Sequence, residues 1–274
     1  MNIPRIGSSS FRLGGGNTHG IIRHLSRLKH NYDEIISLEN LCLAWEEFII
    51  GKKQKRDVLS FRENLMDNIV ALHEILRNRA YCHGGYHSFY ITDPKRRHIH
   101  KASVRDRLLH HAVYRILYPF FDKTFIADSF SCRMDKGTHK ALNRFRAMAF
   151  KISRNNTRTC WVLKCDIRKF FANIDHHILL QILRNYIPDQ NIIDLLERVI
   201  KSFETAPGKG LPLGNLTSQL FANIYMNEFD QFVKHKLKAR YYIRYADDFV
   251  ILSLNKRELE ELIPQIALFL KEQL

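Results

Sequence analysis

The chain has 274 residues, of which 45% are hydrophobic, enough for one large domain or two subdomains with a substantial core. No run of about 18 apolar residues is present, which excludes a membrane-spanning segment. Lys and Arg total 43 against 28 Asp and Glu, a formal net charge of +15. This excess predicts a polyanionic partner, because each phosphate that a protein neutralises releases counterions and adds affinity.

The N-terminus and the cysteines indicate a protein of the cytosol. The first 20 residues are rich in Gly and Ser and predict a flexible leader, without the apolar core and cleavage site of a secretory signal. The five cysteines include no CxxC pair, so they predict reduced thiols rather than a disulfide framework or zinc ribbon. None of the 14 histidines has a recognised zinc spacing.

The first half of the chain predicts two helices with an extended segment between them. Residues 56–80 carry Leu and Ile at spacings of four, three and four, and residues 103–121 repeat apolar residues at every fourth position. Two extended segments around a basic, mobile turn at Asp93-Pro94 separate them. Dense positive charge here and over 51–56, with aromatic residues nearby, suits a nucleic-acid groove.

The second half of the chain mixes strands with helices. The apolar run that starts at Cys160 predicts a strand, and Asp166 lies at its far end. The later predicted elements are helices over 176–186 and 190–204, a glycine-rich loop entering a long helix over 208–237, a hairpin over 241–253 and a helix over 256–272. This order predicts an α+β fold with an antiparallel sheet.

Two adjacent aspartates, Asp247 and Asp248, lie at the predicted turn of the hairpin. Asp is common in turns, so this pair alone is unspecific. If the strand of Asp166 is a neighbour, however, three carboxylates meet, which is unfavourable without divalent cations. Mg²⁺ binds carboxylate oxygens and completes its shell with water and substrate phosphates. Two such ions about 3.5 to 4 Å apart would serve nucleotidyl transfer.

Several motifs together resemble those of reverse transcriptases, in particular bacterial enzymes related to group II introns. YADD (Tyr245 to Asp248) is similar to the YxDD turn of the family, and LKCDIRKFFANI (Leu163 to Ile174) to the motif with the first catalytic aspartate. Three further segments resemble the finger-to-palm region and the loop-helix under the incoming nucleotide: VRDRLLHHAVYRILYPFFD (104–122), SFSCRMDKGTHKAL (129–142) and GLPLGNLTSQLFANIY (210–225). Their order and spacing hold over about residues 56 to 255.

The resemblance implies the fingers and palm of a right-hand polymerase, with an antiparallel palm sheet. Residues 1–55 would form a leader and helical extension, residues 56–158 mainly the fingers and the finger-to-palm helix, and residues 159–274 mainly the palm. Residues 176–210 would return to the fingers. The family continues into a helical thumb, which we expect to be absent here, so that the chain is a fragment or takes its thumb from elsewhere.

The resemblance also implies the metal site. Asp166, Asp247 and Asp248 would bind two Mg²⁺ ions, with Mn²⁺ as a substitute, and the backbone carbonyl of Ile167 would reach one of them. Phe171 would be a steric gate, a ring under the sugar that leaves no room for a 2′-hydroxyl. Such a set of ligands would make the chain a nucleotidyltransferase.

The remaining predicted contacts belong to substrates. Arg97 would hold the triphosphate from the fingers, since a guanidinium suits phosphate geometry. The other predicted nucleotide-binding residues are Lys95, Arg96, Leu213, Gly214 and Gln219, and the predicted nucleic-acid-binding residues are Arg105, Arg133 and Tyr245. For Arg105 and Arg133 a second interpretation is open, in which each pairs with a neighbouring carboxylate.

The loop before the long helix departs from the common family pattern. Many reverse transcriptases carry Gln before the loop Gly and Pro after its Ser, where this chain has Leu213 and Gln219. This variation resembles the reverse transcriptases of diversity-generating retroelements. Because Leu213 cannot hydrogen-bond the incoming nucleotide, discrimination between right and wrong bases is weakened. We hypothesise error-prone copying, particularly opposite adenine, as the resemblance implies.

The leading interpretation is therefore the RNA-directed DNA polymerase of a diversity-generating retroelement, in the cytoplasm of a bacterium or encoded by a phage. Its expected partners are template RNA, an RNA–DNA duplex, dNTPs and a small basic accessory protein, and no membrane. One alternative places the same enzyme in a group II intron or a phage-defence system. Another is an inactive RNA-binding scaffold or truncated relic, against which the intact aspartates argue.

Overall fold

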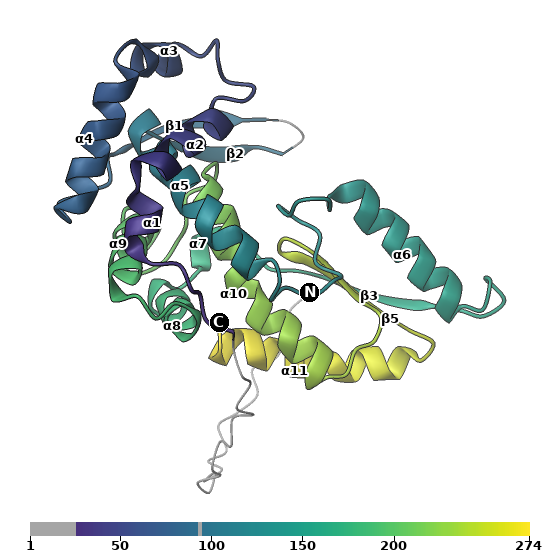
Figure 1. Cartoon of the computed structure of the whole chain (residues 1–274). Coiled ribbons are helices and arrows are strands. Elements are labelled where there is room, and N and C mark those ends of the chain that lie inside the picture. The colour runs from purple at the N-terminus through teal and green to yellow at the C-terminus, as the bar shows by residue number, and fades with distance from the viewer. Residues whose placement is uncertain (1–25, 93–94) are drawn as a thin grey trace, which may run out of the picture.

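The computed structural model describes residues 26–92 and 95–274, so the predicted leader and the predicted turn at Asp93-Pro94 lie outside the described residues. The described residues include a two-stranded and a three-stranded sheet. Figure 1 shows a large helical body, a hairpin that projects from it, and the larger sheet flanked by helices. Both sheets are antiparallel. The predicted α+β class is confirmed, and the predicted domain limits, which nothing in the structure tests, stay a prediction.

The helical body includes the N-terminal helices, which pack around α5. These helices are α1 (Tyr32–Ile36), α2 (Leu38–Phe48), α3 (Arg56–Glu63), α4 (Leu65–Arg77) and α5 (Val104–Phe121). The buried side chain of Asn40 joins three of them, because its amide donates to the carbonyls of Ile35 and Ala112 at 2.8 and 3.1 Å. The N-terminal extension is therefore part of the same core as α5.

Two helices differ from the ranges that hydrophobic spacing predicts. The helix predicted over 56–80 is interrupted at Asn64, whose φ of −123° and ψ of 46° lie outside the helical region. The helix predicted over 190–204 ends earlier, as α9 (Gln190–Ile200). There the hydroxyl of Ser202 donates to a carbonyl of the last turn at 2.6 Å and satisfies it.

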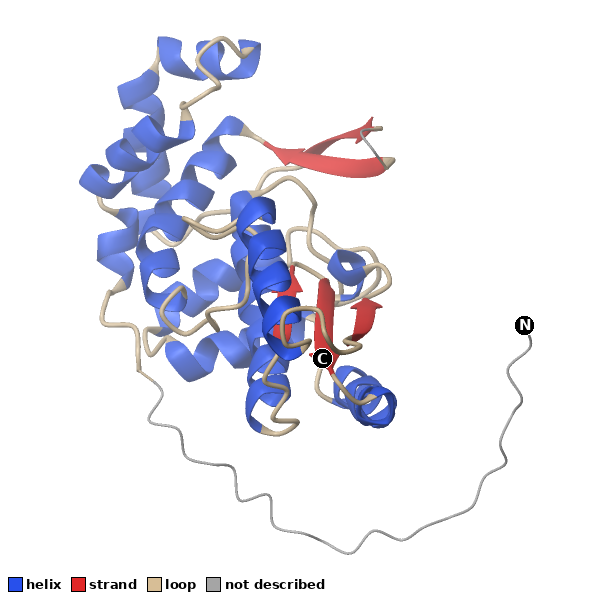
Figure 2. Ribbon diagram, turned by 90° about the vertical axis from the view of Figure 1, so that its right-hand side faces the viewer, coloured by secondary structure: helices blue, strands red, loops and turns tan. Residues whose placement is uncertain are grey.

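A hairpin projects from the helical body, as both views show (Figures 1 and 2). Its strands are β1 (Tyr86–Ile91) and β2 (Arg97–Ala102), as predicted from the two extended segments. β2 leads directly into α5, whose first turn is capped by the side chain of Ser103. The hairpin is thus fixed at its base and exposed toward its tip.

The three-stranded sheet contains β3 (Trp161–Asp166), β4 (Tyr242–Tyr245) and β5 (Asp248–Ser253). Their order is β3-β5-β4, so the central strand β5 pairs with both neighbours. The predicted strand that ends at Asp166 and the predicted hairpin over 241–253 are therefore both present, and they are adjacent. Because side chains alternate between the faces of a strand, each face takes every second residue.

Helices cover the two faces of this sheet differently. They are α6 (Thr138–Ile152), α10 (Leu216–His235) and α11 (Lys256–Glu272). On one face Phe249 packs against Phe229 of α10, with ring centroids 4.9 Å apart. On the other face α6 contributes Met148 to a small cluster with Ile243. The buried Phe249 face fixes the register of the strands, because a slip of one residue would expose it.

The remaining helices follow β3. They are α7 (Phe170–Asn173), α8 (His176–Tyr186) and α9. α6 and α7 are additions to the elements that the sequence predicts. Within the described ranges, no helix has both the length and the apolar character needed to cross a bilayer.

Candidate active site

The turn between β4 and β5 carries two of the three predicted catalytic aspartates. Tyr245 pairs with Asp248, so the connecting loop consists of Ala246 and Asp247 alone. Ala246 has a φ of +55°, a left-handed conformation that is strained for a residue other than glycine. Asp247 is half-buried and Asp248 is exposed. The turn therefore presents two carboxylates at the end of the sheet.

The third aspartate comes from the neighbouring strand. Asp166, the last residue of β3, is the direct partner of Asp248 in the antiparallel pair. Residues directly opposite in such a pair project from the same face, with Cβ atoms about 4.5 to 5.5 Å apart. The structure thus brings Asp166, Asp247 and Asp248 together from two distant parts of the sequence.

The electrostatics of Asp247 reflect this convergence. Burial raises the pKa of its carboxyl group above the usual value, and the negative charges of Asp166 and Asp248 raise it further. A hydrogen bond from its own backbone and the positive charge of Arg97 act in the opposite direction. Arg97, on the exposed strand β2, therefore acts on the charge of this carboxylate site. A cation placed among them would relieve their repulsion.

The donor set fits a divalent oxygen-binding cation in chemistry. Mg²⁺ binds protein carboxylates and completes its coordination shell with substrate phosphates and water, so three carboxylates at one end of the sheet suit it. As the side chains lie, the described part of the chain contains no group of three or more His, Cys, Asp or Glu that could hold a metal ion. The fit accordingly rests on the register of Asp166 with Asp248 and on the raised pKa of Asp247.

Two residues follow Asp166 closely in the predicted site. Ile167 comes directly after β3 and packs partly against the main core. Of the two adjacent rings, Phe170 is buried, whereas Phe171 stays half-buried. Phe171 is also held by its backbone, whose carbonyl accepts from the N–H of Leu211 at 2.8 Å. Of the two rings, the one with free surface is thus the one predicted to be the steric gate.

The loop before α10 supports the base of the hairpin. The N–H of His100 donates to the carbonyl of Leu213, and the Asn215 amide donates to the carbonyl of His100, each at 2.9 Å. Between them Gly214 has a φ of +108°, and a Cβ there would lie 2.7 Å from the Cγ2 of Ile99. The hairpin approaches this loop closely because Gly214 has no side chain. Gln219, predicted to bind nucleotide, is half-buried in the first turn of α10.

A basic cavity of about 560 Å³ adjoins this loop. Its cations are Lys52, Lys55, Lys101 and Arg107, and its lining also includes Gly214, Asn215, Leu216 and Gln219. Burial and the charge of Arg107 lower the pKa of Lys52. Lys101 and Arg107 both form ion pairs with Asp57, so part of the positive charge of the cavity is already neutralised. The sequence signals Lys52 and Lys55 by their dense basic run, but it does not show that this run faces the loop.

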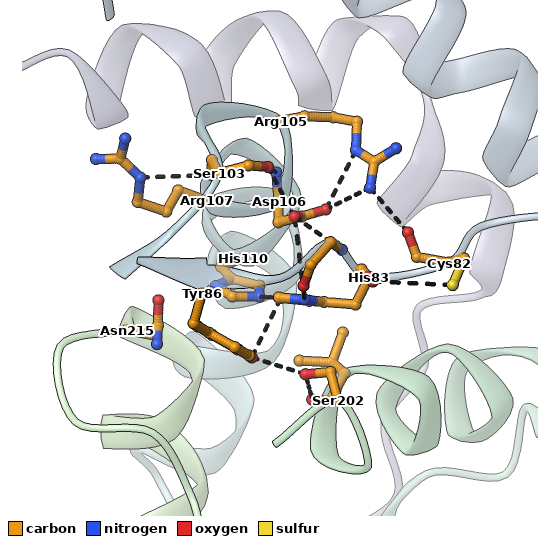
Figure 3. A network of polar contacts seen from close by, with 12 residues as sticks. Cys82, His83, Tyr86, Ser103, Arg105, Asp106, Arg107, His110, Ser202 and Asn215 are labelled. Atoms are coloured by element: carbon orange, nitrogen blue, oxygen red, sulfur yellow. Dashed lines mark hydrogen bonds and ion pairs between the residues drawn. The ribbon is translucent and has the colours of Figure 1, made fainter. Parts of the chain in front are cut away.

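Arg105 and Arg133 are engaged within the protein. Arg105 donates to the buried Asp106 at 2.9 Å and to the carbonyl of Cys82 at 2.8 Å, within the polar network of Figure 3. Arg133 has a side chain that is 6% exposed and donates to Asp122 at 2.7 Å. Of the two interpretations open for each arginine, the structure shows the carboxylate pair. Contact with nucleic acid stays a prediction for both.

The other predicted contact residues are exposed. Lys95, Arg96 and Arg97 lie at the exposed end of the hairpin, and the guanidinium of Arg96 stacks 4.1 Å from the ring centre of Tyr90. Tyr245 is 38% exposed, and its hydroxyl accepts from Thr138 at 3.1 Å. Of these residues, Arg97 acts electrostatically on Asp247, and Tyr245 comes directly before the Ala246–Asp247 loop.

Comparison with known proteins identifies the family. Residues 92–273 match the family described as "Reverse transcriptase (RNA-dependent DNA polymerase)". The chain belongs to the reverse transcriptase family. The match covers β2, the three-stranded sheet and α10, so every element that carries a predicted catalytic aspartate of this reverse transcriptase lies within it.

Individual relatives are more distant. Protein YkfC of Escherichia coli (strain K12) is 26% identical over 187 residues, 55% of this chain and 49% of that protein. The group II intron-encoded protein LtrA of Lactococcus lactis subsp. cremoris is 30% identical over 134 residues, 47% of this chain and 21% of LtrA. A chain of a partial Cas6-RT-Cas1--Cas2 complex has a TM-score of 0.48 at 22% identity, covering 89% of this reverse transcriptase and 43% of that chain. This reverse transcriptase therefore spans about half of YkfC and about a fifth of LtrA.

Gly214→Ala should displace the hairpin from its supporting loop. The new Cβ would meet Ile99 in a backbone conformation that already disfavours side chains, so we expect KM for the incoming nucleotide to rise about tenfold. Steady-state primer extension measures this. Gly137→Ala is the matched control, because Gly137 has a φ of +110° and nothing within 4 Å of its Cβ position. Equal KM values for the two variants would show that the close approach of the hairpin to Gly214 does not affect nucleotide binding.

Proposed function

We propose that this reverse transcriptase is an RNA-directed DNA polymerase that adds dNTPs to the 3′ end of a primer. The observation that carries the proposal is the pairing of Asp166 with Asp248 across β3 and β5. Asp247 lies next to them, in the two-residue loop between β4 and β5. Family membership supports the same reaction. In that reaction the primer 3′-oxygen bonds to the α-phosphorus of the dNTP, and pyrophosphate leaves.

In this proposal the three carboxylates hold two divalent cations, Mg²⁺ or Mn²⁺ in its place. The bound ions would activate the 3′-hydroxyl and neutralise charge on the leaving pyrophosphate. The raised pKa of Asp247 supports a cation at this position, since its negative charge is disfavoured without one. Ile167 follows Asp166 directly and would offer its backbone carbonyl to the same site.

Residues of the hairpin would bind the triphosphate. Arg97 already acts electrostatically on Asp247, so its charge is placed to neutralise phosphates bound beside the carboxylates. Lys95 and Arg96 adjoin it at the exposed end of the hairpin. Guanidinium groups hold phosphates in a fixed, forked geometry, which would orient the nucleotide for in-line attack.

The template strand would follow the basic cavity. The cavity is lined by its four cations and by Gly214, Asn215, Leu216 and Gln219, and the net positive charge of the whole chain supports a polyanion there. A strand in this cavity would lie beside the loop that supports the hairpin. The template would therefore reach the nucleotide site on the side opposite to the triphosphate contacts.

We further propose error-prone synthesis of the kind made by diversity-generating retroelements, with template RNA and a small basic accessory protein as partners. Leu213 supports this, because an apolar side chain offers no hydrogen bond to the incoming nucleotide. The similarity to LtrA, a group II intron-encoded protein, supports the intron-related alternative. The flanking genes decide between them, because a variable repeat, a template repeat and an accessory gene would favour diversification, and intron RNA domains the alternative.

The decisive experiment replaces the three aspartates singly. Asp166→Asn, Asp247→Asn and Asp248→Asn should each lower primer extension by at least about a thousandfold, because several kcal/mol of charge stabilisation are lost. The assay uses the full-length protein with an RNA template, a DNA primer, dNTPs and Mg²⁺. Asp67→Asn, the same change at an exposed site on α4, is the control and should retain activity. An inactive wild type that still binds RNA would replace the polymerase by the scaffold interpretation.

Phe171→Ala should admit ribonucleotides. Loss of the ring opens space under the sugar, so we expect the ratio of rNTP to dNTP incorporation to rise at least about tenfold, the scale of one lost packing contact. Phe171→Tyr keeps the ring and should keep the discrimination. Single-nucleotide incorporation kinetics give both ratios. An unchanged ratio in the alanine variant would show that Phe171 is only a core residue.

Leu213→Gln should raise fidelity. A side-chain amide would offer the incoming nucleotide a polar contact that is sensitive to base-pair geometry, so we expect misincorporation opposite template adenine to fall about tenfold. Sequencing of cDNA made on a defined RNA measures the error rate. Leu268→Gln introduces the same side chain at an exposed position of α11 and should leave the error rate unchanged. Equal error rates for wild type and Leu213→Gln would remove Leu213 from the explanation.

A further inference from the structure

A buried arginine lies directly behind the turn that carries Asp247 and Asp248. Arg244 belongs to β4 and is 1% exposed. Its guanidinium forms a two-pronged ion pair with Asp230 of α10, with Nε and Nη2 lying 2.8 and 2.7 Å from the two carboxylate oxygens. Asp230 is itself fully buried, and its Oδ1 also accepts from the hydroxyl of Tyr242 at 2.6 Å. The arginine is therefore anchored on the helix beneath the sheet.

The same guanidinium also binds the turn. Its Nη1 donates to the backbone carbonyl of Ala246 at 2.9 Å. Nη2 donates further to the hydroxyl of Ser129 at 3.1 Å, and the strand backbone is tied to the same segment by bonds of 3.0 Å to Asp128 and Phe130. One side chain thus joins the turn, α10 and the segment before α6.

Ala246 is the residue of the turn that most needs such a restraint. Its φ of +55° is strained for a residue with a side chain, and such conformations persist where the surroundings fix them. Since Ala246 and Asp247 form the whole loop, rotation of the Ala246 peptide would redirect the Asp247 carboxylate. Holding the Ala246 carbonyl therefore holds the direction of an acidic side chain.

We propose that Arg244 is a positioning residue for the Asp247–Asp248 turn, acting through the Ala246 carbonyl from its anchor on Asp230. This inference rests on the proposed polymerase function for its effect on rate, although the geometry itself does not. Arg244 touches neither substrate nor metal in this role. It sets the orientation of the carboxylates that do.

A role in stability alone explains the buried Arg244–Asp230 ion pair less well. Two charges taken out of water gain little net stability, and apolar residues of similar volume often serve a core as well or better. What an apolar pair cannot supply is a donor aimed at the Ala246 carbonyl. The position of Nη1 at 2.9 Å from that oxygen is therefore the feature that the test must isolate.

The test uses two variants that affect stability and positioning differently. Arg244→Lys keeps the charge, but a single ammonium cannot replace the forked contacts to Asp230 and reach Ala246 as well. Arg244→Met combined with Asp230→Asn removes both charges and leaves Tyr242 an acceptor. The control is Arg184→Met combined with Glu197→Gln, which removes an arginine–carboxylate pair between α8 and α9.

Three quantities are measured on the full-length protein. Thermal unfolding reports stability, primer extension gives kcat and KM for dNTP, and electron paramagnetic resonance without nucleic acid gives the affinity for Mn²⁺. For the Arg244→Met, Asp230→Asn protein we expect kcat to fall about a hundredfold with KM nearly unchanged, as for a misplaced catalytic group. Mn²⁺ affinity should fall about tenfold, as for loss of a group that orients metal ligands. Arg244→Lys should lose about tenfold in kcat, and the control should match wild type.

The outcomes are distinguishable. A stable Arg244→Met, Asp230→Asn protein with wild-type kcat and Mn²⁺ affinity would overturn the proposal and leave Arg244 as a core residue. If that protein does not fold, Arg244→Lys decides, and wild-type values for it would overturn the proposal equally. A wild type that extends no primer defeats the proposed function, whereas the Mn²⁺ affinities still test the positioning role.

Discussion

The repulsion among three carboxylates at one end of a small sheet is the constraint on which the rest of the structure depends. Asp166 and Asp248 cannot separate without breaking the pairing of β3 with β5, and that register is fixed by the buried Phe249 face of the sheet. Asp247 is held by a two-residue loop. The apolar packing of the sheet thus offsets the repulsion among the three carboxylates. A divalent cation would bind to the carboxylates that this packing holds together.

α10 connects the two sides of the site. Its first turn follows the loop in which Leu213 and Asn215 hold the base of the hairpin through hydrogen bonds to His100. Farther along the same helix, Asp230 anchors Arg244 and thereby the aspartate turn. A rigid helix with these contacts keeps the base of the hairpin and the aspartate turn in fixed relation. Movement of the hairpin would then occur about its base, without disturbing the turn.

Local sequence patterns predicted much of this arrangement, because they report on short-range physics. Apolar spacing predicted α5, the aromatic and β-branched runs on either side of Asp247 and Asp248 predicted the β4–β5 hairpin, and the strand ending at Asp166 was predicted from its apolar run. Such local patterns do not show which distant residues contact one another in the fold. Nothing in the sequence around Arg244 indicates Asp230, and the basic run at Lys52 does not indicate the loop that it faces. The break at Asn64 was missed because apolar spacing continues across it.

The distribution of charge explains how a polyanion could approach an acidic site. Three carboxylates would repel the phosphates of a nucleic acid, yet the chain as a whole carries a net charge of +15. The cations lie on the approaches, in the basic cavity and at the exposed end of the hairpin, while Arg244 and Arg133 are buried in ion pairs and contribute little to the surface field. A polyanion would therefore be attracted to the basic cavity and to the exposed end of the hairpin, and repelled where the three carboxylates meet. A divalent cation is the species that can turn that last repulsion into a bridge between carboxylate and phosphate.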